Sequence, residues 1–523
     1  MKESHKVLRL LDKSKKSIIR TIFSRLGVIL LLLLLQFMLL FSVFRWFASF
    51  IPHYLGSAMV FNILMAIVII NSQSDATTKV TWLIVVMVLP VFGALLYLYT
   101  RGDVGHRALK KRAGAVARAT ADELTQNPET ISRLSASDPG AAALARYIGR
   151  FGCHPLWQNT DVTYYPSGEK KLAALLEDLE QARKYIFLEY FIIDEGIMWG
   201  QILEILAQKA SAGVEVRVMY DGTCEFSTLP HDYPQRLAKL GIHCKMFAPV
   251  RPFLSTHYNY RDHRKIAVID GRVAYTGGVN LADEYINEIE RFGHWKDVAI
   301  RLEGDAVRSF TLMFLQMWAL DDSVSGIASY LAPAATERLP SAGFVAPYGD
   351  CPLDENKVGE RVYMDILFRA RNYVHIMSPY LILDGQMENA LKYAAERGVD
   401  VHLILPGIPD KKSVFWLART YYASLIASGV RISEYKPGFV HAKVFVADDQ
   451  EAVVGTINLD YRSLYHHFEC AAYMHGVPCI ADIEQDFQQT LTKCEHITER
   501  HLRRLPWHQN ICGAVLKALA PLM

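Results

Sequence analysis

The sequence lacks a strong net charge and lacks paired cysteines. Its 56 lysines and arginines nearly balance its 54 aspartates and glutamates, which leaves a formal net charge of +2 over 523 residues. Because nucleic-acid-binding domains are usually strongly basic, this balance gives no support for a nucleic-acid partner. The 8 cysteines include no C-x-x-C pair, so neither a zinc site nor a disulfide framework is expected.

Long apolar runs are missing from most of the chain and gather near its start, at 26–44, 54–70 and 80–100. About 20 apolar residues cross a bilayer as a helix, so these runs predict a multi-pass transmembrane anchor over residues 1–100. The first run is too long for the apolar core of a signal peptide. Basic residues precede the first run and follow the third. The positive-inside rule places both basic segments in the cytoplasm, which two spans allow and three do not. The number of spans and the membrane face of the remaining chain therefore stay open.

The rest of the chain predicts an α/β protein that contains a duplication. ARKYIFLEYFIID (182–194) is similar to ARNYVHIMSPYLILD (370–384), and further segments match in the same order. The repeat period of about 180 residues is far longer than that of a solenoid, so it indicates a duplicated domain. We expect a connector at 101–155, a first half at 156–335 and a second half at 336–523.

The duplication contains one polar motif twice. It reads HRKIAVIDGRVAYTGGVN at 263–280 and HAKVFVADDQEAVVGTIN at 441–458. A folding hairpin copied by duplication would explain the apolar positions. It gives no reason to keep histidine, lysine and asparagine on a face that is partly buried.

Each motif reads as a β-hairpin. Side chains two apart in a strand share a face, so His263 and Lys265 are expected to point the same way. Gly271-Arg272 suits the turn, and the returning strand brings Asn280 back beside this pair. The second motif, with its turn at Asp449-Gln450, is expected to present His441, Lys443 and Asn458 in the same manner. A pseudo-twofold axis between the halves can bring both sets into one site.

Two histidines that face each other suit phosphodiester chemistry. A neutral imidazole can attack phosphorus, while a protonated imidazole gives a proton to the leaving oxygen. The lysines and asparagines can hold the nonbridging oxygens as charge builds on them. No metal is required for this scheme, because the ammonium groups supply the positive charge.

Four carboxylates accompany the motifs. Asp297 and Glu469 each follow a motif in a strand-like context. Hydrogen-bonded to an imidazole, each would fix the tautomer and bias the proton, and an ordinary salt bridge is the alternative. Asp270 and Asp448 fall on the other strand face or at the turn. We expect them to bond turn amides and not to transfer protons.

In these motifs the chain resembles the phospholipase D superfamily, whose signature is H-x-K-x4-D followed by G-[GST]-x-N. The surrounding text, such as FGHWKDVAIRLEGDAV and GTINLDYRSLYHHFE, is similar to bacterial cardiolipin synthases. So is the N-terminal KVTWLIVVMVLPVFGALLYLYTRG. The resemblance implies a duplicated phospholipase D-type α/β domain, with two mixed β-sheets flanked by helices and related by a pseudo-twofold axis, preceded by the transmembrane anchor.

The resemblance also implies a reaction in the bacterial plasma membrane, without a metal or cofactor. One phosphatidylglycerol gives its phosphatidyl group to a histidine, and a second phosphatidylglycerol takes it, which yields cardiolipin and glycerol. His263 is the implied nucleophile, served by Glu469, and His441 is the implied acid, served by Asp297. The implied catalytic residues are His263, Lys265, Asp270, His441, Lys443 and Asp448, and the implied substrate-binding residues are Asn280, Asn458, Asp297 and Glu469.

Other reactions share these motifs. A membrane-bound phospholipase D would use water, or another alcohol, as the acceptor after the same first step. A membrane-tethered nuclease of the superfamily is disfavoured by the near-neutral charge. Acyl-chain preference, headgroup preference and oligomeric state are left open by the sequence.

Overall fold

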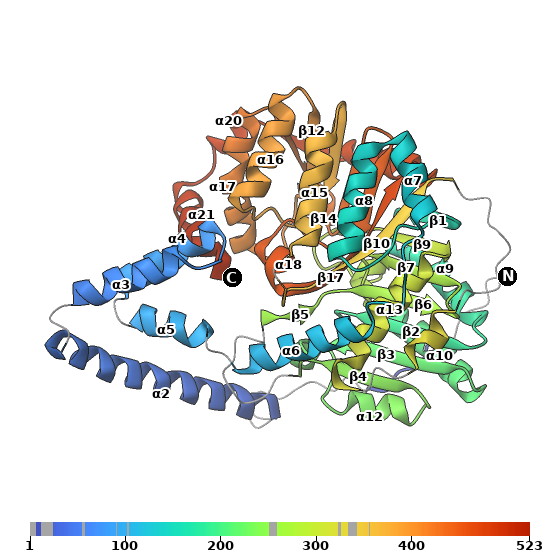
Figure 1. The fold of residues 1–523 in the computed structure, drawn as a ribbon, viewed down its shortest axis with the longest axis horizontal. Helices are drawn as coiled ribbons and strands as arrows, with labels where there is room; N and C mark the ends of the chain where they lie inside the picture. Colours follow the sequence, from blue (N-terminus) through green and yellow to red (C-terminus); the bar gives the residue numbers. More distant parts are fainter. Residues whose placement is uncertain are drawn as a thin grey trace.

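The computed structural model describes most of the chain and forms two β-sheets with a shared core between them (Figure 1). The described residues are 7–11, 25–54, 58–89, 92–101, 104–249, 259–322, 326–332, 342–354 and 356–522.

The first sheet has seven strands in the order β1-β9-β7-β6-β2-β3-β4. β2, β3 and β4 run parallel, and the other neighbours are antiparallel. The central strand β2 has every residue buried, as expected for a strand covered on both faces. The strands are β1 (Thr160–Tyr165), β2 (Tyr185–Tyr190), β3 (Glu215–Asp221), β4 (His243–Phe247), β6 (Lys265–Ile269), β7 (Val273–Gly277) and β9 (Ala299–Gly304).

The second sheet repeats this order strand for strand as β10-β17-β16-β15-β11-β12-β13, and adds β18 at its edge. The duplication expected from the sequence is therefore confirmed in the topology. These strands are β10 (Phe344–Asp350), β11 (Tyr373–Met377), β12 (Asp400–Pro406), β13 (Arg431–Tyr435), β15 (Val444–Ala447), β16 (Glu451–Gly455), β17 (His467–His475) and β18 (Cys494–Ile497).

Three short strands connect the two halves. β5 (Arg261–Asp262) comes from the first half and pairs with β17 of the second sheet. In return, β14 (Gly438–Val440) of the second half pairs with β8 (His294–Lys296) of the first. Each half thus extends a piece of backbone onto the other.

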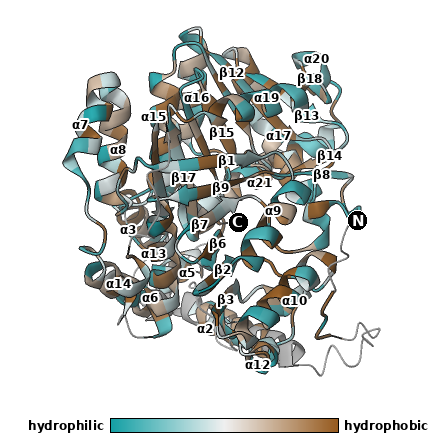
Figure 2. Cartoon of the chain, turned by 90° about the vertical axis from the view of Figure 1, so that its right-hand side faces the viewer, coloured by the Kyte–Doolittle hydropathy of each residue, from teal (hydrophilic) through white to brown (hydrophobic). Residues whose placement is uncertain are grey.

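Helices cover the outer face of each sheet, and two more lie in the centre. The central core joins Phe187, Ile300 and Phe310 of the first half to Val454 and Phe487 of the second. Figure 2 shows hydrophobic residues along the strands and hydrophilic residues mainly on helix surfaces and loops. The covering helices are α9 (Gly168–Glu180), α10 (Ile197–Ser211) and α12 (Tyr233–Ala238) on the first sheet, and α8 (Pro139–Phe151), α15 (Val358–Arg369), α16 (Gly385–Glu396) and α17 (Lys412–Ala427) on the second. The central helices are α13 (Val307–Trp318) and α19 (Cys479–Leu491).

Further helices complete the body. Side-chain caps fix several helix starts: Ser167, Asp384 and Asp460 each accept a backbone N–H from the first turn that follows. The remaining helices are α6 (Val104–Ala119), α7 (Pro128–Ser137), α11 (Cys224–Ser227), α14 (Ile327–Tyr330), α18 (Tyr461–His466), α20 (Glu499–Leu502) and α21 (Trp507–Leu519), with 3-10 turns η2 (Asp283–Ile286), η3 (Ala319–Asp321) and η4 (Ala520–Leu522).

Both motif hairpins form as the sequence predicts. β6 pairs with β7 and β15 pairs with β16, each antiparallel. Asp270 and Asp448 open the turns with φ of 55° and 52°, a region that aspartate tolerates better than most residues. One detail differs from expectation. Each motif histidine lies just before the first strand of its hairpin, β6 or β15. The backbone that leads to the histidine is a short strand, β5 or β14, that pairs with the opposite half.

The N-terminal helices extend to one side of this body (Figure 1). They are α2 (Arg25–Tyr54), α3 (Ala58–Ile70), α4 (Ala76–Val88) and α5 (Phe92–Arg101). In the described part of the chain, every helix falls short of the length or apolarity needed to cross a membrane. The spans expected at 26–44, 54–70 and 80–100 are therefore not confirmed. The third run is divided between α4 and α5, which have 13 and 10 residues, and at 1.5 Å per residue each covers about 20 Å or less.

A buried ion pair between the halves generates a stability prediction. Lys296 Nζ lies 2.7 Å from Asp486 Oδ2, and Tyr164 donates its hydroxyl to the same oxygen at 2.6 Å. Asp486→Ala leaves a buried ammonium group unpaired, so we expect unfolding to become easier by about 3–5 kcal/mol. Chemical denaturation of the purified protein measures this. Removing the exposed Glu499 partner of Arg503 should change little. An equal effect of the two variants would contradict the prediction.

Candidate active site

The two motif histidines lie where the halves exchange backbone. β5 pairs in parallel with β17 so that Asp262 is opposite Phe468, and His263 follows immediately. Its N–H donates to the carbonyl oxygen of Phe468 at 2.9 Å. β14 pairs in the same way with β8, and the N–H of His441 donates to the carbonyl oxygen of Lys296 at 2.7 Å. Each histidine is thus attached to the half that did not supply it.

The residue that follows each of these acceptor positions, Glu469 in β17 and Asp297 directly after β8, is a carboxylate that binds the imidazole. His263 Nδ1 lies 2.8 Å from Glu469 Oε1, and His441 Nδ1 lies 2.8 Å from Asp297 Oδ2. The contacts cross between the halves, as the resemblance implied. Because each Nδ1 is held by a carboxylate, Nδ1 carries the proton in the neutral ring and Nε2 is left for chemistry.

Glu469 is held as an anion. It accepts hydrogen bonds from the hydroxyls of Ser463, at 2.5 Å, and Thr456. Burial raises the pKa of this carboxyl, but His263 and His467 outweigh burial and hold the pKa well below its usual range.

Asp297 is held differently. Its Oδ1 accepts the N–H of Val298 at 2.8 Å. Gly278 makes room for it, since a Cβ at that position would lie 2.0 Å from Asp297 Oδ1. In the first half, the motif therefore needs glycine at position 278 to leave room for Asp297.

The motif lysines are buried beside the imidazoles. Lys265 donates to the carbonyl oxygen of His263 at 2.5 Å, and Lys443 donates to that of His441. Burial lowers the pKa of Lys265 to about 8 and that of Lys443 to about 7. The charge of Lys265 also lowers the pKa of Lys443 and of His441, which places both motifs in one electrostatic environment.

Burial lowers the pKa of both imidazoles, to about 4 for His441 and well below the usual range for His263. The sequence predicts one neutral and one protonated histidine. A neutral His263 agrees with that expectation. The lowered pKa of His441 also favours a neutral ring, so the protonated state expected of one histidine stays a prediction.

The two motif asparagines differ in their surroundings. Asn280 accepts the N–H of Ile192 at 3.1 Å and donates to the hydroxyl of Tyr285 at 2.7 Å. Among the described residues, the side-chain oxygen of Asn458 is buried and has no hydrogen-bond partner. A role for both amides in binding phosphate oxygens stays a prediction, and Asn280 also fixes its own loop.

The motif aspartates do not join this cluster. Asp270 accepts the N–H groups of residues 183–185, and Asp448 accepts those of residues 371–373, at 2.7–2.9 Å. Their inclusion in the catalytic set is therefore corrected, because both carboxylates are occupied by the backbone that enters β2 and β11. The expectation that they bond amides of the turn is met only in part, because the amides belong to the segments that enter β2 and β11 and not to the hairpin turns.

The sequence did not single out the rings that flank the imidazoles. His467 lies 5.2 Å from His263 between ring centres, and Trp295 lies 5.3 Å from His441. Both stand two residues before the carboxylate of their strand, and that shared position is the signal that could have found them. Ligand atoms of His263, His467 and Glu469 lie within 4.8 Å of one another. A metal ion bound by all three would take the ring of His263 as a ligand.

The fold and site define a class of enzyme. Two α/β halves that exchange strands to place two histidine–carboxylate pairs and two lysines in one site are typical of phospholipase D-like phosphodiester-transfer enzymes. A crystal structure of phosphatidylserine synthase from Haemophilus influenzae Rd KW20 shares this fold, with a TM-score of 0.56 at 14% identity over 72% of this chain and 97% of that one.

Sequence comparison identifies the family. Residues 175–318 and 363–491 match the family described as "Cardiolipin synthase, PLD-like domain", and residues 60–102 match "Phospholipase_D-nuclease N-terminal". A cardiolipin synthase of Halalkalibacterium halodurans is 32% identical over 96% of this chain and 100% of its own length. An uncharacterized protein of Streptococcus mutans is 53% identical over 87% of this chain and 98% of its own. The chain belongs to the cardiolipin synthase family of the phospholipase D superfamily.

The different contacts of Asp448 and Glu469 lead to opposite expectations for one chemical change. Asp448→Asn weakens three amide contacts and should lower the free energy of unfolding by about 1–3 kcal/mol while the folded enzyme keeps its kcat. Glu469→Gln should lower kcat by about 100-fold or more, because the amide neither stabilises the imidazolium nor enforces the tautomer. Denaturation curves and kcat per folded molecule separate the two. A larger loss of kcat in Asp448→Asn would contradict this assignment.

The lysine pKa values predict the alkaline limb of the pH profile. Below about 7 for Lys443 and 8 for Lys265 the ammonium groups are charged and can bind phosphate, and above these values they become neutral. We therefore expect kcat/KM to fall as pH rises through 7–8. Arginine stays charged, so Lys443→Arg should move the fall to higher pH, whatever its effect on the maximum. An unmoved limb would show that Lys443 does not cause it.

Proposed function

We propose that the protein is a cardiolipin synthase, which transfers a phosphatidyl group from one phosphatidylglycerol to another through a phosphatidyl-histidine. The observation that carries this proposal is the crossed pair of hydrogen bonds, His263 to Glu469 and His441 to Asp297. These bonds leave two Nε2 atoms for one phosphodiester, one as a nucleophile and one as an acid. The family match and the named relatives support the choice of substrate.

In the first step His263 Nε2 attacks phosphorus. The P–N bond forms as the bond from phosphorus to the glycerol headgroup oxygen breaks, and His441 gives its Nε2 proton to that oxygen, so that glycerol leaves. Glu469 stabilises the cationic ring of His263, and Lys265 and Lys443 stabilise the negative charge that grows on the nonbridging oxygens.

In the second step His441 acts as a base instead of an acid. Its neutral Nε2 takes the proton from a headgroup hydroxyl of a second phosphatidylglycerol, and that oxygen attacks phosphorus. The P–N bond breaks, the electron pair returns to His263, and cardiolipin forms. Water attacking at this point would instead give phosphatidate, the product of the alternative hydrolase.

The protein is proposed to act at the bacterial plasma membrane, because donor, acceptor and product are all membrane lipids. Apolar side chains exposed on the N-terminal helices and on α21 support contact with lipid. Trp507, Ile511 and Val515 follow a four-residue spacing on α21 and are exposed. α21 is joined to α4 by a hydrogen bond from Thr81 to the carbonyl oxygen of Ala518 at 2.9 Å.

The reaction is tested by incubating the purified full chain with phosphatidylglycerol vesicles. We expect cardiolipin and glycerol in equal amounts, with little phosphatidate, as separated by chromatography and mass spectrometry. Phosphatidate as the main product would overturn the synthase assignment in favour of the hydrolase.

The two histidines should fail at different points. His263→Ala should lose the covalent lipid adduct and turnover, a fall of about 1,000-fold or more. His441→Ala lacks the acid but keeps the nucleophile, so it should still form adduct from a donor with a good leaving group, such as a nitrophenyl ester. Intact-protein mass spectrometry detects the adduct. An adduct in His263→Ala, or near-normal turnover in His441→Ala, would refute the roles.

A further inference from the structure

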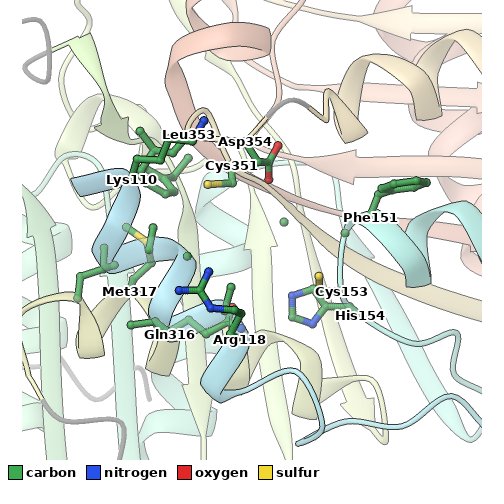
Figure 3. Close-up of a pocket in the computed structure, with 18 of the residues that line it drawn as sticks. Lys110, Arg118, Phe151, Cys153, His154, Gln316, Met317, Cys351, Leu353 and Asp354 are labelled. Atoms are coloured by element: carbon green, nitrogen blue, oxygen red, sulfur yellow. The ribbon is translucent and has the colours of Figure 1, made fainter. Parts of the chain in front are cut away.

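A cavity of about 470 Å³ lies on the reverse side of the His263–Glu469 pair. Side chains alternate across a strand, so Phe468 lies on the face opposite to Glu469. Phe468 and Arg264 line the cavity, whereas the catalytic imidazoles do not. The remaining walls come from α6, the end of α13 and the segments 151–154 and 349–354 (Figure 3).

The lining combines an apolar interior with a cationic rim. Figure 3 shows Met317 and Lys110 on one side and Phe151 and His154 on the other. The apolar part is formed by Val116, Phe151, Met317, Leu320, Leu353 and Phe468. Lys110, Lys111 and Arg118 are exposed along α6, and Asp354 is the single carboxylate among the lining residues. This combination is complementary to an acyl chain attached to an anionic headgroup.

One buried polar atom in the lining lacks a partner. His154 is 3% exposed, and its Nδ1 has no hydrogen-bond partner within the described residues. Burial and the charge of Arg264 lower its pKa to about 3, so the ring is neutral. His154 therefore adds a neutral, buried ring to the cavity wall and no charge.

The cavity is also connected to the catalytic pair. Arg264 donates from Nε to the carbonyl oxygen of Glu469 at 3.2 Å and from Nη1 to that of Met313 at 3.3 Å. The carbonyl oxygen of Phe468 receives the N–H of His263. Figure 1 shows α6 between the N-terminal helices and the two sheets.

We propose that this cavity is a second lipid site, which binds an anionic phospholipid with an acyl chain inside and its phosphate at Lys110, Lys111 and Arg118. The site is separate from the position of the reacting phosphorus. The inference rests on the proposed function only in that the protein meets anionic phospholipid in its membrane. Occupancy therefore does not require turnover.

Native cysteines provide the test. Cys153 is exposed and lines the cavity, whereas Cys512 is exposed on α21, away from the lining. The full chain, as His263→Ala to keep the lipid unchanged, is placed in phosphatidylcholine nanodiscs with or without phosphatidylglycerol. Modification by N-ethylmaleimide is followed at each cysteine by peptide mass spectrometry. With lipid at about ten times its Kd, we expect modification of Cys153 to slow by about tenfold in the anionic discs, and that of Cys512 to stay the same.

A matched pair of arginines on one helix controls for general attraction to the surface. Arg118 lines the cavity and Arg107 does not, although both are exposed on α6. Arg118→Gln should restore the modification rate of Cys153, and Arg107→Gln should not. Glycerol phosphate, which has the headgroup without a chain, should give no protection. Equal rates in both discs, equal effects of the two variants, or protection by glycerol phosphate would overturn the proposal.

The result is independent of the reaction. Protection of Cys153 combined with a wild-type protein that forms no cardiolipin would reject the proposed function and leave the lipid site standing. Cardiolipin synthesis without protection would reject the lipid site alone.

Discussion

The active site depends on one constraint, which is that each imidazole is oriented by a carboxylate of the opposite half. The parallel pairing of β5 with β17 and of β14 with β8 sets the register so that His263 reaches Glu469 and His441 reaches Asp297. Neither half supplies the carboxylate that binds its own motif histidine. The shared apolar core and the buried Lys296–Asp486 pair hold this register, so packing energy between the halves maintains the catalytic geometry.

The duplication is not symmetric where chemistry requires a difference. Glu469 is bound by two hydroxyl groups, whereas Asp297 is bound by a backbone N–H. An imidazole ring, that of His467, flanks His263, and an indole, that of Trp295, flanks His441. Two copies of one motif can therefore hold two histidines with different proton affinities, as a nucleophile and an acid require.

Several buried charged residues lie next to the two motif histidines. Lys265 and Lys443 donate to the backbone carbonyl oxygens of the two motif histidines, and Arg264 Nη1 lies 4.0 Å from Glu189 Oε1. Burial and the charge of Asp262 raise the pKa of Glu189 well above its usual range. A protonated Glu189 does not neutralise the charge of Arg264, which lines the cavity.

The sequence by itself determined the duplication, the motif hairpins and the type of chemistry, because these depend on local periodicity and on residue spacing within each copy. It also indicated that Asp270 and Asp448 bind amides. It did not reveal Ser463, Thr456 and His467 around Glu469, nor that each histidine lies before its strand. Those features were decided by the tertiary structure. Ser463 and Thr456 lie only 6 and 13 residues from Glu469, but without a regular spacing that a sequence pattern would reveal. The place of each histidine arises from contacts between segments 206 and 144 residues apart, whose register is set by packing of the two halves and leaves no periodic trace in the chain.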